Sequence, residues 1–305
     1  MEPLVVVQIV VAAVQDMLFA LAVGALVCSA LLGRLDPGCP AASVALGRSR
    51  LGALCALGLA CGLYLWLEAA VMSGSPFSEA GPVVSAVLTE SHFGIAWSVG
   101  LAGVVFACLG GTRNSRSARW LAAAGMVVYV AGKAAASHAA DAGDFTLREA
   151  VHVVHLAATA LWAGSVLVAA QVLCRRNDAA SATPVQRVAF CTRLSHLATI
   201  ALGVVIVTGI YNATQNTAPV SAPLLSVLYG RVLTLKLVFV TLAVLLGGYN
   251  RMIYLPRLHT TAVGGGAAYR DAQRGFDRLL AVEAVAMLTV LAVAGVLGHT
   301  SPSGG

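Results

Sequence analysis

Charged residues are scarce in this sequence of 305 residues. Only 10% of them are Asp, Glu, Lys or Arg, whereas soluble domains carry about 25%. Hydrophobic residues make up 59%, so the chain lacks the polar side chains that would cover a water-soluble core. The shortage of charge argues against most soluble enzyme folds. The high hydrophobic content argues equally against intrinsic disorder.

Lysine is almost missing, since only Lys133 and Lys236 occur among the 19 basic residues. A net charge of +6 could otherwise suggest a nucleic-acid partner. The basic residues instead form short arginine clusters between long apolar runs. Such clusters are typical of the loops that orient membrane helices, so we expect a lipid bilayer and no nucleic acid as the partner.

Eight apolar runs are long enough to cross a membrane, because about 20 residues suffice for a helix. They cover roughly residues 4–32, 51–72, 92–111, 120–138, 149–174, 192–213, 229–249 and 277–299. The sequence therefore predicts an all-α, polytopic integral membrane protein. We expect eight transmembrane helices in a single membrane domain over residues 1–305.

The arginine clusters follow the first, third, fifth and seventh runs, while residues 73–91 and 214–228 contain no basic residue. The positive-inside rule places the arginine-rich loops in the cytoplasm, with both termini on the periplasmic side of an inner membrane. The first run has no basic segment before it and is too long for a cleavable signal peptide. None of the seven cysteines falls in a predicted outer loop, so no disulfide framework is expected.

The two halves of the chain share a weak, ordered similarity. Val14-Gln15-Asp16 followed by Gly24 aligns with Val154-His155-Leu156 followed by Gly164. Three later pairs of short segments match in the same order along the chain. If the similarity reflects a duplication, residues 1–140 and 141–305 are two parallel four-helix units. The alternative is chance similarity between apolar helices. A true duplication predicts a binding site between the units.

Histidine is concentrated near the predicted outer side. His152 and His155 are three residues apart, so they share a helix face, and Glu149 extends that face by one turn. Imidazole suits copper, zinc, iron and nickel. The sequence predicts an outward-facing metal site, although a histidine at a helix end often only caps the helix. The candidate metal ligands are His92, His138, His152, His155 and His299.

Other polar or soft side chains could support this site. Asp16 and Glu68 are carboxylates inside apolar runs, where ionisable groups usually mark a site or a wet cavity. Either could pair with Lys236. Met72 could supply a soft ligand, although a methionine more often fills core space, and Trp162 could close the site below the histidines. Cysteines near the inner helix ends could receive Cu(I) or could simply fill the bundle: Cys28, Cys108, Cys174 and Cys191.

Several motifs together resemble the copper resistance protein D family of bacterial inner-membrane proteins. They are Ser137-His138-Ala139-Ala140, His155-Leu156 through Leu161-Trp162-Ala163-Gly164, Thr208-Gly209-Ile210-Tyr211-Asn212-Ala213, and Tyr229-Gly230-Arg231. The resemblance implies an eight-helix protein for copper uptake or handling. It also implies a separate periplasmic CopC-like copper-binding protein as partner. His138 and His155 match family motif positions, whereas His152 stands where an acidic residue is expected and His92 where threonine is common.

Three functions remain open from the sequence. The leading hypothesis is copper transport without catalysis, in which Cu(I) or Cu(II) arrives at the outer imidazoles and leaves near the inner thiols. A haem b-binding redox protein is the second, because helical bundles can hold haem between histidines on facing helices. The third is a docking platform for the periplasmic copper chaperone.

Overall fold

The structure, a computed structural model, describes residues 3–35, 40–112, 115–137, 143, 145–174, 183–217 and 223–300. Every regular element in these ranges is helical, which confirms the all-α prediction. The helices of 20 residues or more are α1 (Pro3–Leu35), α2 (Pro40–Ser73), α4 (His92–Gly111), α5 (Arg116–Ala135), α6 (Leu147–Cys174), α7 (Pro184–Thr217), α8 (Leu228–Tyr249) and α10 (Gly266–Leu297). The short elements are η1 (Phe77–Glu79), α3 (Gly81–Glu90), η4 (Leu224–Ser226), the π-helical turn η5 (Asn250–Tyr254) and α9 (Leu255–Thr261).

Several helices begin well before their apolar runs, at residue 40 for α2, 184 for α7 and 266 for α10. A helix of 33 residues, such as α1, is about 50 Å long, whereas the hydrocarbon core measures about 30 Å. A prediction from apolar composition therefore covers only the part of each helix that lies within the bilayer. Outside it, capping groups define the helix ends. At the start of α7 the Gln186 side chain accepts from the Thr183 amide at 2.9 Å, and the Thr183 hydroxyl accepts from the Gln186 amide at 3.2 Å.

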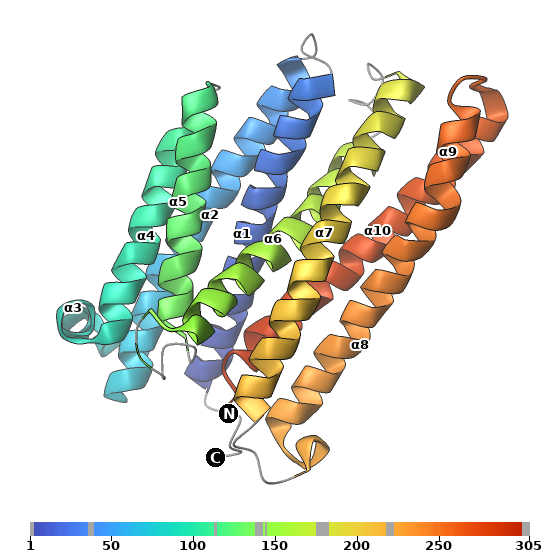
Figure 1. The fold of residues 1–305 in the computed structure, drawn as a ribbon. Coiled ribbons are helices and arrows are strands. Elements are labelled where there is room, and N and C mark those ends of the chain that lie inside the picture. The colour runs from blue at the N-terminus through green and yellow to red at the C-terminus, as the bar shows by residue number, and fades with distance from the viewer. Residues whose placement is uncertain are drawn as a thin grey trace.

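Seven of the described helices are long and apolar enough to cross a membrane, namely all the long ones except α5. This confirms a multi-pass helical membrane protein. Helix α5 carries basic residues at both ends but packs along α4 for most of its length (Figure 1). Small residues permit this close approach, because a Cβ added at Gly103 or Gly125 would overlap the backbone of the opposite helix.

The two ends of the bundle differ in charge. The N- and C-termini lie at one end, and α9 lies at the other (Figure 1). The described arginines at the end of α1 and at the starts of α2, α5, α7 and α10 belong to the end that also holds α9. Large apolar side chains cover the outside, for example Leu59, Ile200 and Val207, each about two-thirds or more exposed. Such a surface suits lipid.

Helices α1 and α6 form the centre of the bundle and meet at two glycines (Figure 1). A Cβ built on Gly24 would overlap the carbonyl group of Gly164, and one built on Gly164 would overlap the carbonyl group of Ala20. Gly164 therefore serves the close packing of these two helices. Around this contact the helices pair in an ordered way: α1 packs on α2 and α10, while α6 packs on α7 and α5.

Candidate functional site

A cavity of about 670 Å³ lies in the half of the bundle that contains the chain termini. All eight long helices contribute side chains to its wall. Its wall therefore contains helices from both halves of the chain. The polar residues that line it come from the first half of α1, α4, α6 and α8 and from the second half of α2, α5 and α7, together with Ser137 and His299, which follow α5 and α10.

His155 lines this cavity from α6 with its ring oriented by α7. Its Nδ1 atom lies 2.9 Å from the hydroxyl oxygen of Thr208, and that hydroxyl lies 2.6 Å from the carbonyl oxygen of Val204. A hydroxyl has one hydrogen, and Thr208 donates it to the carbonyl oxygen of Val204, which can only accept. Nδ1 of His155 must then donate to Thr208, which leaves the lone pair on Nε2. A metal-binding histidine is commonly held in this way, with its other nitrogen donating to an oxygen.

His152 lies one turn before His155 on the same face of α6, as the three-residue spacing predicts. The two rings are nearly parallel, with centroids 6.5 Å apart and an interplanar angle of 16°. The side-chain amide nitrogen of Asn212 on α7 lies 3.4 Å from Nδ1 of His152. Since an amide nitrogen only donates, this bond places the proton of a neutral His152 on Nε2. The two imidazoles are thus fixed by two residues of α7 that are also one turn apart.

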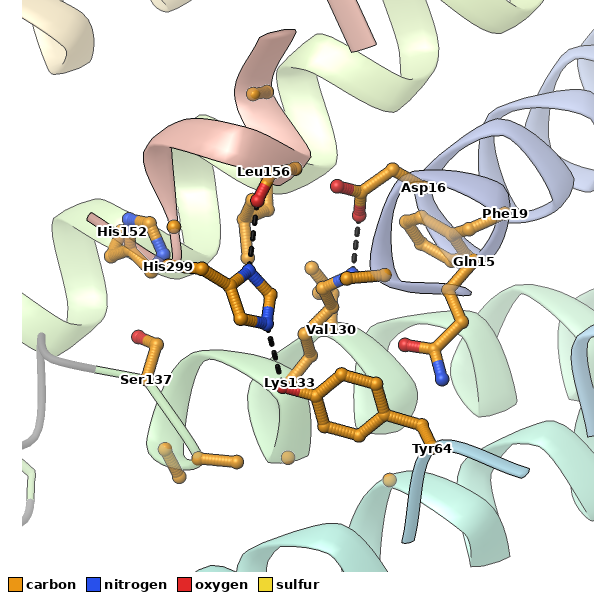
Figure 2. A pocket seen from close by; sticks show the side chains of 18 of the residues that line it. Gln15, Asp16, Phe19, Tyr64, Val130, Lys133, Ser137, His152, Leu156 and His299 are labelled. Carbon is orange, nitrogen blue, oxygen red and sulfur yellow. Dashed lines mark hydrogen bonds and ion pairs between the residues drawn. The ribbon is translucent and has the colours of Figure 1, made fainter. Parts of the chain in front are cut away.

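His299 enters the cavity from the residues just after α10, as Figure 2 shows. Its Nδ1 lies 2.8 Å from the carbonyl oxygen of Gly295, and its Nε2 lies 3.1 Å from the hydroxyl of Tyr64 on α2. Nδ1 donates to the carbonyl, so the Nε2 of a neutral imidazole accepts from Tyr64. This bond joins the last helix of the second half to a helix of the first half.

The charged side chains within the helices pair differently from the expectation. Asp16 forms an ion pair with Lys133 on α5 (Figure 2), and Glu68 accepts a hydrogen bond from the amide of Gln8. The expected pairing of Lys236 with Asp16 or Glu68 is therefore wrong as an ion pair. Lys236 lines the cavity without an ion-pair partner within 4.0 Å among the residues that the structure describes.

The remaining predicted site residues lie in several places. His92 is exposed at the start of α4 and lines the cavity. Glu149 accepts a hydrogen bond from the Phe145 amide at 2.7 Å, so its carboxylate caps α6. Met72 is 55% exposed and is not in the cavity wall. His138 lies outside the described residues.

Trp162 is buried on α6 two turns beyond His155, on the side away from the chain termini. It lines a second, smaller cavity. The described residues contain no group of three or more His, Cys, Asp or Glu side chains close enough to hold a metal ion together. His92, His152, His155 and His299 line one cavity without forming a three-ligand site among the described residues.

Sequence reasoning missed the roles of Tyr64 and Thr208. Both are polar residues within apolar helices, and Thr208 precedes Asn212 by one turn just as His152 precedes His155. That matched spacing on two neighbouring helices was the one available signal for this pairing. It required the knowledge that α6 and α7 are adjacent.

Comparison with known protein families gives two matches. The family model described as Copper resistance protein D matches residues 188–297. The model described as Copper resistance protein D-like, N-terminal domain, matches residues 1–146. Helix α6 lies wholly between the two matched segments. Comparisons with curated proteins and with solved structures gave no match.

The two matches together span most of the chain and follow one another in order. They agree with the family motifs in the sequence and with the multi-pass helical bundle. The chain therefore belongs to the copper resistance protein D family, a membrane family with a role in copper resistance or uptake.

Proposed function

We propose that the protein carries copper ions inward across the bacterial inner membrane, without catalysing a reaction. The observation that carries the proposal is the orientation of His155. Its Nδ1–H donates to Thr208, so the Nε2 lone pair is left to bind a metal ion within a cavity of about 670 Å³. Imidazole is a good ligand for copper in either oxidation state.

Copper would bind first to His155, with His152 as the second ligand one turn away. A neutral His152 that accepts from Asn212 would have to change its tautomer, or rotate, to offer a nitrogen. His92, His138 and His299 are the further candidate ligands. Glu68 and Asp16 would contribute negative charge near the cavity, although Lys133 neutralises much of the charge of Asp16.

The proposed orientation puts the cavity on the periplasmic side. We treat α5 as an eighth membrane span, because it is 20 residues long and packs along α4. With eight spans, the arginine-rich end lies in the cytoplasm and both termini lie outside. Copper could then be delivered to the cavity by a separate CopC-like protein.

Duplication of a four-helix unit would account for the pairing of the helices. If α1, α2, α4 and α5 correspond to α6, α7, α8 and α10, then the contact of α1 with α10 is equivalent to that of α6 with α5. Both contacts occur, and the aligned Gly24 and Gly164 meet each other. This arrangement supports two parallel units, residues 1–140 and 141–305, with the cavity between them.

The membrane potential would suffice to drive uptake. It favours the inward movement of a cation by about 2.3 kcal/mol per charge for every 100 mV. The sequence offers no recognisable ATP-hydrolysing motif. The proposed transport is therefore facilitated or coupled to another ion.

The test compares copper binding and copper uptake in the wild type and in His155→Ala. His196→Ala is the matched control, because His196 is exposed at the other end of the bundle. We expect His155→Ala to weaken binding in detergent at least about tenfold and to slow uptake into vesicles, since it removes a metal ligand. Equal affinity and uptake in both variants would overturn the proposal.

The same purified sample tests the haem hypothesis. Haem b needs imidazoles on facing helices, whereas His152 and His155 lie on one helix, and both nitrogens of His299 have hydrogen-bond partners. We therefore expect no haem absorption. A Soret band that disappears in His155→Ala would favour a redox protein instead.

A further inference from the structure

A second cavity, of about 240 Å³, lies in the arginine-rich half of the bundle. Helices α6, α7, α8 and α10 contribute to its wall, together with the π-helical turn η5. Trp162 on α6 lines it, whereas His155 and Thr159 of the same helix line the larger cavity. Helix α6 therefore lines both cavities. Thr159 is in the wall of the larger cavity, and Trp162, one turn further along, is in the wall of the smaller one.

Glu283 is the one carboxylate in the wall of this second cavity. It lies on α10 and is 5% exposed, and no described residue donates a hydrogen bond to it or pairs with its charge. Its carboxyl group rests on the backbone of α8, because a Cβ built on Gly247 would lie 2.8 Å from Oε1. A buried carboxylate without a donor is unfavourable in an apolar bundle.

Asn250 adds a second unsatisfied oxygen to the same cavity. It follows Gly247 by three residues, so both face α10, and it is the first residue of the π-helical turn. Its amide nitrogen lies 3.5 Å from the carbonyl oxygen of Phe276, and its buried Oδ1 has no hydrogen-bond partner among the described residues. Single π-helical turns occur frequently at functional sites.

Other titratable or charged groups near Glu283 are few. Cys191 lines the cavity from α7, and Arg251 lines it from η5. Arg251 donates to the Ser195 carbonyl at 3.2 Å and also to Thr199, so its guanidinium is bound to α7. Helices α6 and α8 contribute no charged side chain to this wall. Further along α10, Asp277 pairs with Arg187 on α7.

We infer that Glu283 is a proton-binding site, which takes up a proton from the cytoplasmic side and releases it to the same side when copper passes inward. The inference rests on the proposed transport of copper. A metal ion fits this cavity poorly, because one carboxylate, one thiol and one amide oxygen do not form a ligand set for copper. A proton needs only one carboxylate oxygen and an acceptor such as Oδ1 of Asn250, directly or through water.

Displacement of the proton follows from the electrostatics of the two cavities. Trp162 lies seven residues beyond His155, or about 10 Å along α6. A cation that approaches from the larger cavity favours the ionised carboxylate of Glu283 over its neutral acid, and the effect is strong where the effective dielectric constant is low. Copper that moves inward therefore displaces the proton from Glu283 into the cytoplasmic water. The carboxylate left behind attracts the copper ion and, once copper has left, is neutralised again by a proton from the same water.

The test uses the full-length protein in vesicles whose lumen faces the arginine-rich end and contains a pH-sensitive dye. In the wild type, the first turnover of copper uptake should give a transient acidification of the lumen by about one proton per protein, which is reversed when Glu283 is protonated again from the lumen. Uptake should slow about tenfold for each unit of lumenal acidification in the range where Glu283 titrates. Glu283→Gln carries no exchangeable proton. It should lose both the acidification and the pH dependence, while copper binding to the detergent-solubilised protein stays within about twofold of the wild type.

Two further variants keep the test sharp. Glu283→Asp retains the carboxyl group and should retain proton release, whereas Glu90→Gln makes the same chemical change on an exposed carboxyl and should behave as the wild type. If Glu283→Gln fails to fold, infrared spectroscopy of the wild type decides. A protonated carboxyl band that shifts when copper binds and is altered in Glu283→Asp is expected, and a spectrum without any such band overturns the inference.

The outcomes separate the two proposals. Copper uptake that depends on His155 but releases no proton, or that keeps its pH dependence in Glu283→Gln, overturns the proton site and leaves the transport proposal standing. Copper binding that is indifferent to His155→Ala overturns the proposed transport site first. Proton release that persists in Glu283→Gln would assign the proton to another group.

Discussion

Replacement of Gly164 by alanine should destabilise the bundle, although alanine is the better helix former. The new Cβ would lie much closer than 3.0 Å to the carbonyl oxygen of Ala20, a distance that real Cβ contacts essentially never show. That oxygen belongs to the backbone of α1 and cannot rotate away. The two central helices must therefore separate, and the contacts on either side of the glycine must loosen.

The magnitude follows from the required separation. Helices α1 and α6 must move apart by about 1 Å, which forfeits a quarter to a half of the dispersion energy of the contacts that open. Overpacking of this kind costs about 1–3 kcal/mol. The higher helix propensity of alanine offsets about 0.5–1 kcal/mol of this loss. We therefore expect a net loss of about 1–2 kcal/mol in the free energy of unfolding.

Gly203→Ala is the matched control for this variant. Gly203 lies on the exposed face of α7, and a Cβ there has no neighbour within 4 Å. The same substitution should leave stability unchanged or raise it by up to about 1 kcal/mol. Reversible unfolding in mixed micelles, followed by circular dichroism, measures both. The reasoning is refuted if Gly164→Ala is as stable as Gly203→Ala. Gly24→Ala should resemble Gly164→Ala, with a double variant that costs less than the sum, because one separation relieves both overlaps.

Three further predictions concern single contacts. Thr208→Val should lower copper affinity about 10- to 100-fold in a competition titration, because Nδ1–H of His155 loses its acceptor. Asp277→Asn should lower the free energy of unfolding by about 3–5 kcal/mol in the same micelle assay, since its arginine partner on α7 is only 7% exposed and would stay buried without a counter-charge. Lys133→Met should raise copper affinity roughly three- to tenfold in that titration, because the freed carboxylate of Asp16 would attract the ion.

Each of these predictions has its own control. Thr208→Ser restores the hydroxyl and should restore affinity, and an effect of Thr208→Val that persists in His155→Ala would contradict the assigned hydrogen bond. Asp271→Asn breaks an ion pair on the exposed surface of α10 and should cost less than about 1 kcal/mol. An equal loss of unfolding free energy in Asp271→Asn and Asp277→Asn would contradict the argument that the burial of the arginine partner sets the cost. Copper affinity that is unchanged or lower in Lys133→Met would mean that Asp16 does not act on the ion.

The helices and their order could be predicted from the sequence because a bilayer demands long apolar runs. The shared face of His152 and His155 was also predictable, since it depends only on helix periodicity. Helix α3 was missed because its ten residues are too few to register as a span. The π-helical turn at Asn250 leaves no mark in composition at all.

The contacts of the site depend on neighbours that the sequence does not specify. Lys133 reaches Asp16 across 117 positions, which excluded the expected ion pair with Lys236. Tyr64 and His299 are separated by 235 positions. Each of these pairs follows from which helices are adjacent, and adjacency is set by small-residue packing rather than by the polar residues themselves. Helix periodicity therefore predicts which residues share one helix face, but it does not predict which residues of other helices they contact.

If the two halves are duplicated units, as proposed, their equivalent positions carry different side chains, and this difference would explain why copper binds on one side of the cavity. In the repeat alignment Gln15 of α1 corresponds to His155 of α6. Gln15 donates to the carbonyl oxygen of Ala60 on α2 at 3.0 Å, as His155 donates to Thr208 on α7. Both side chains thus bond to the next long helix of their own half. A glutamine amide that donates there offers no imidazole nitrogen, so the first half could contribute charge through Asp16 while only the second half contributes a metal ligand at this position.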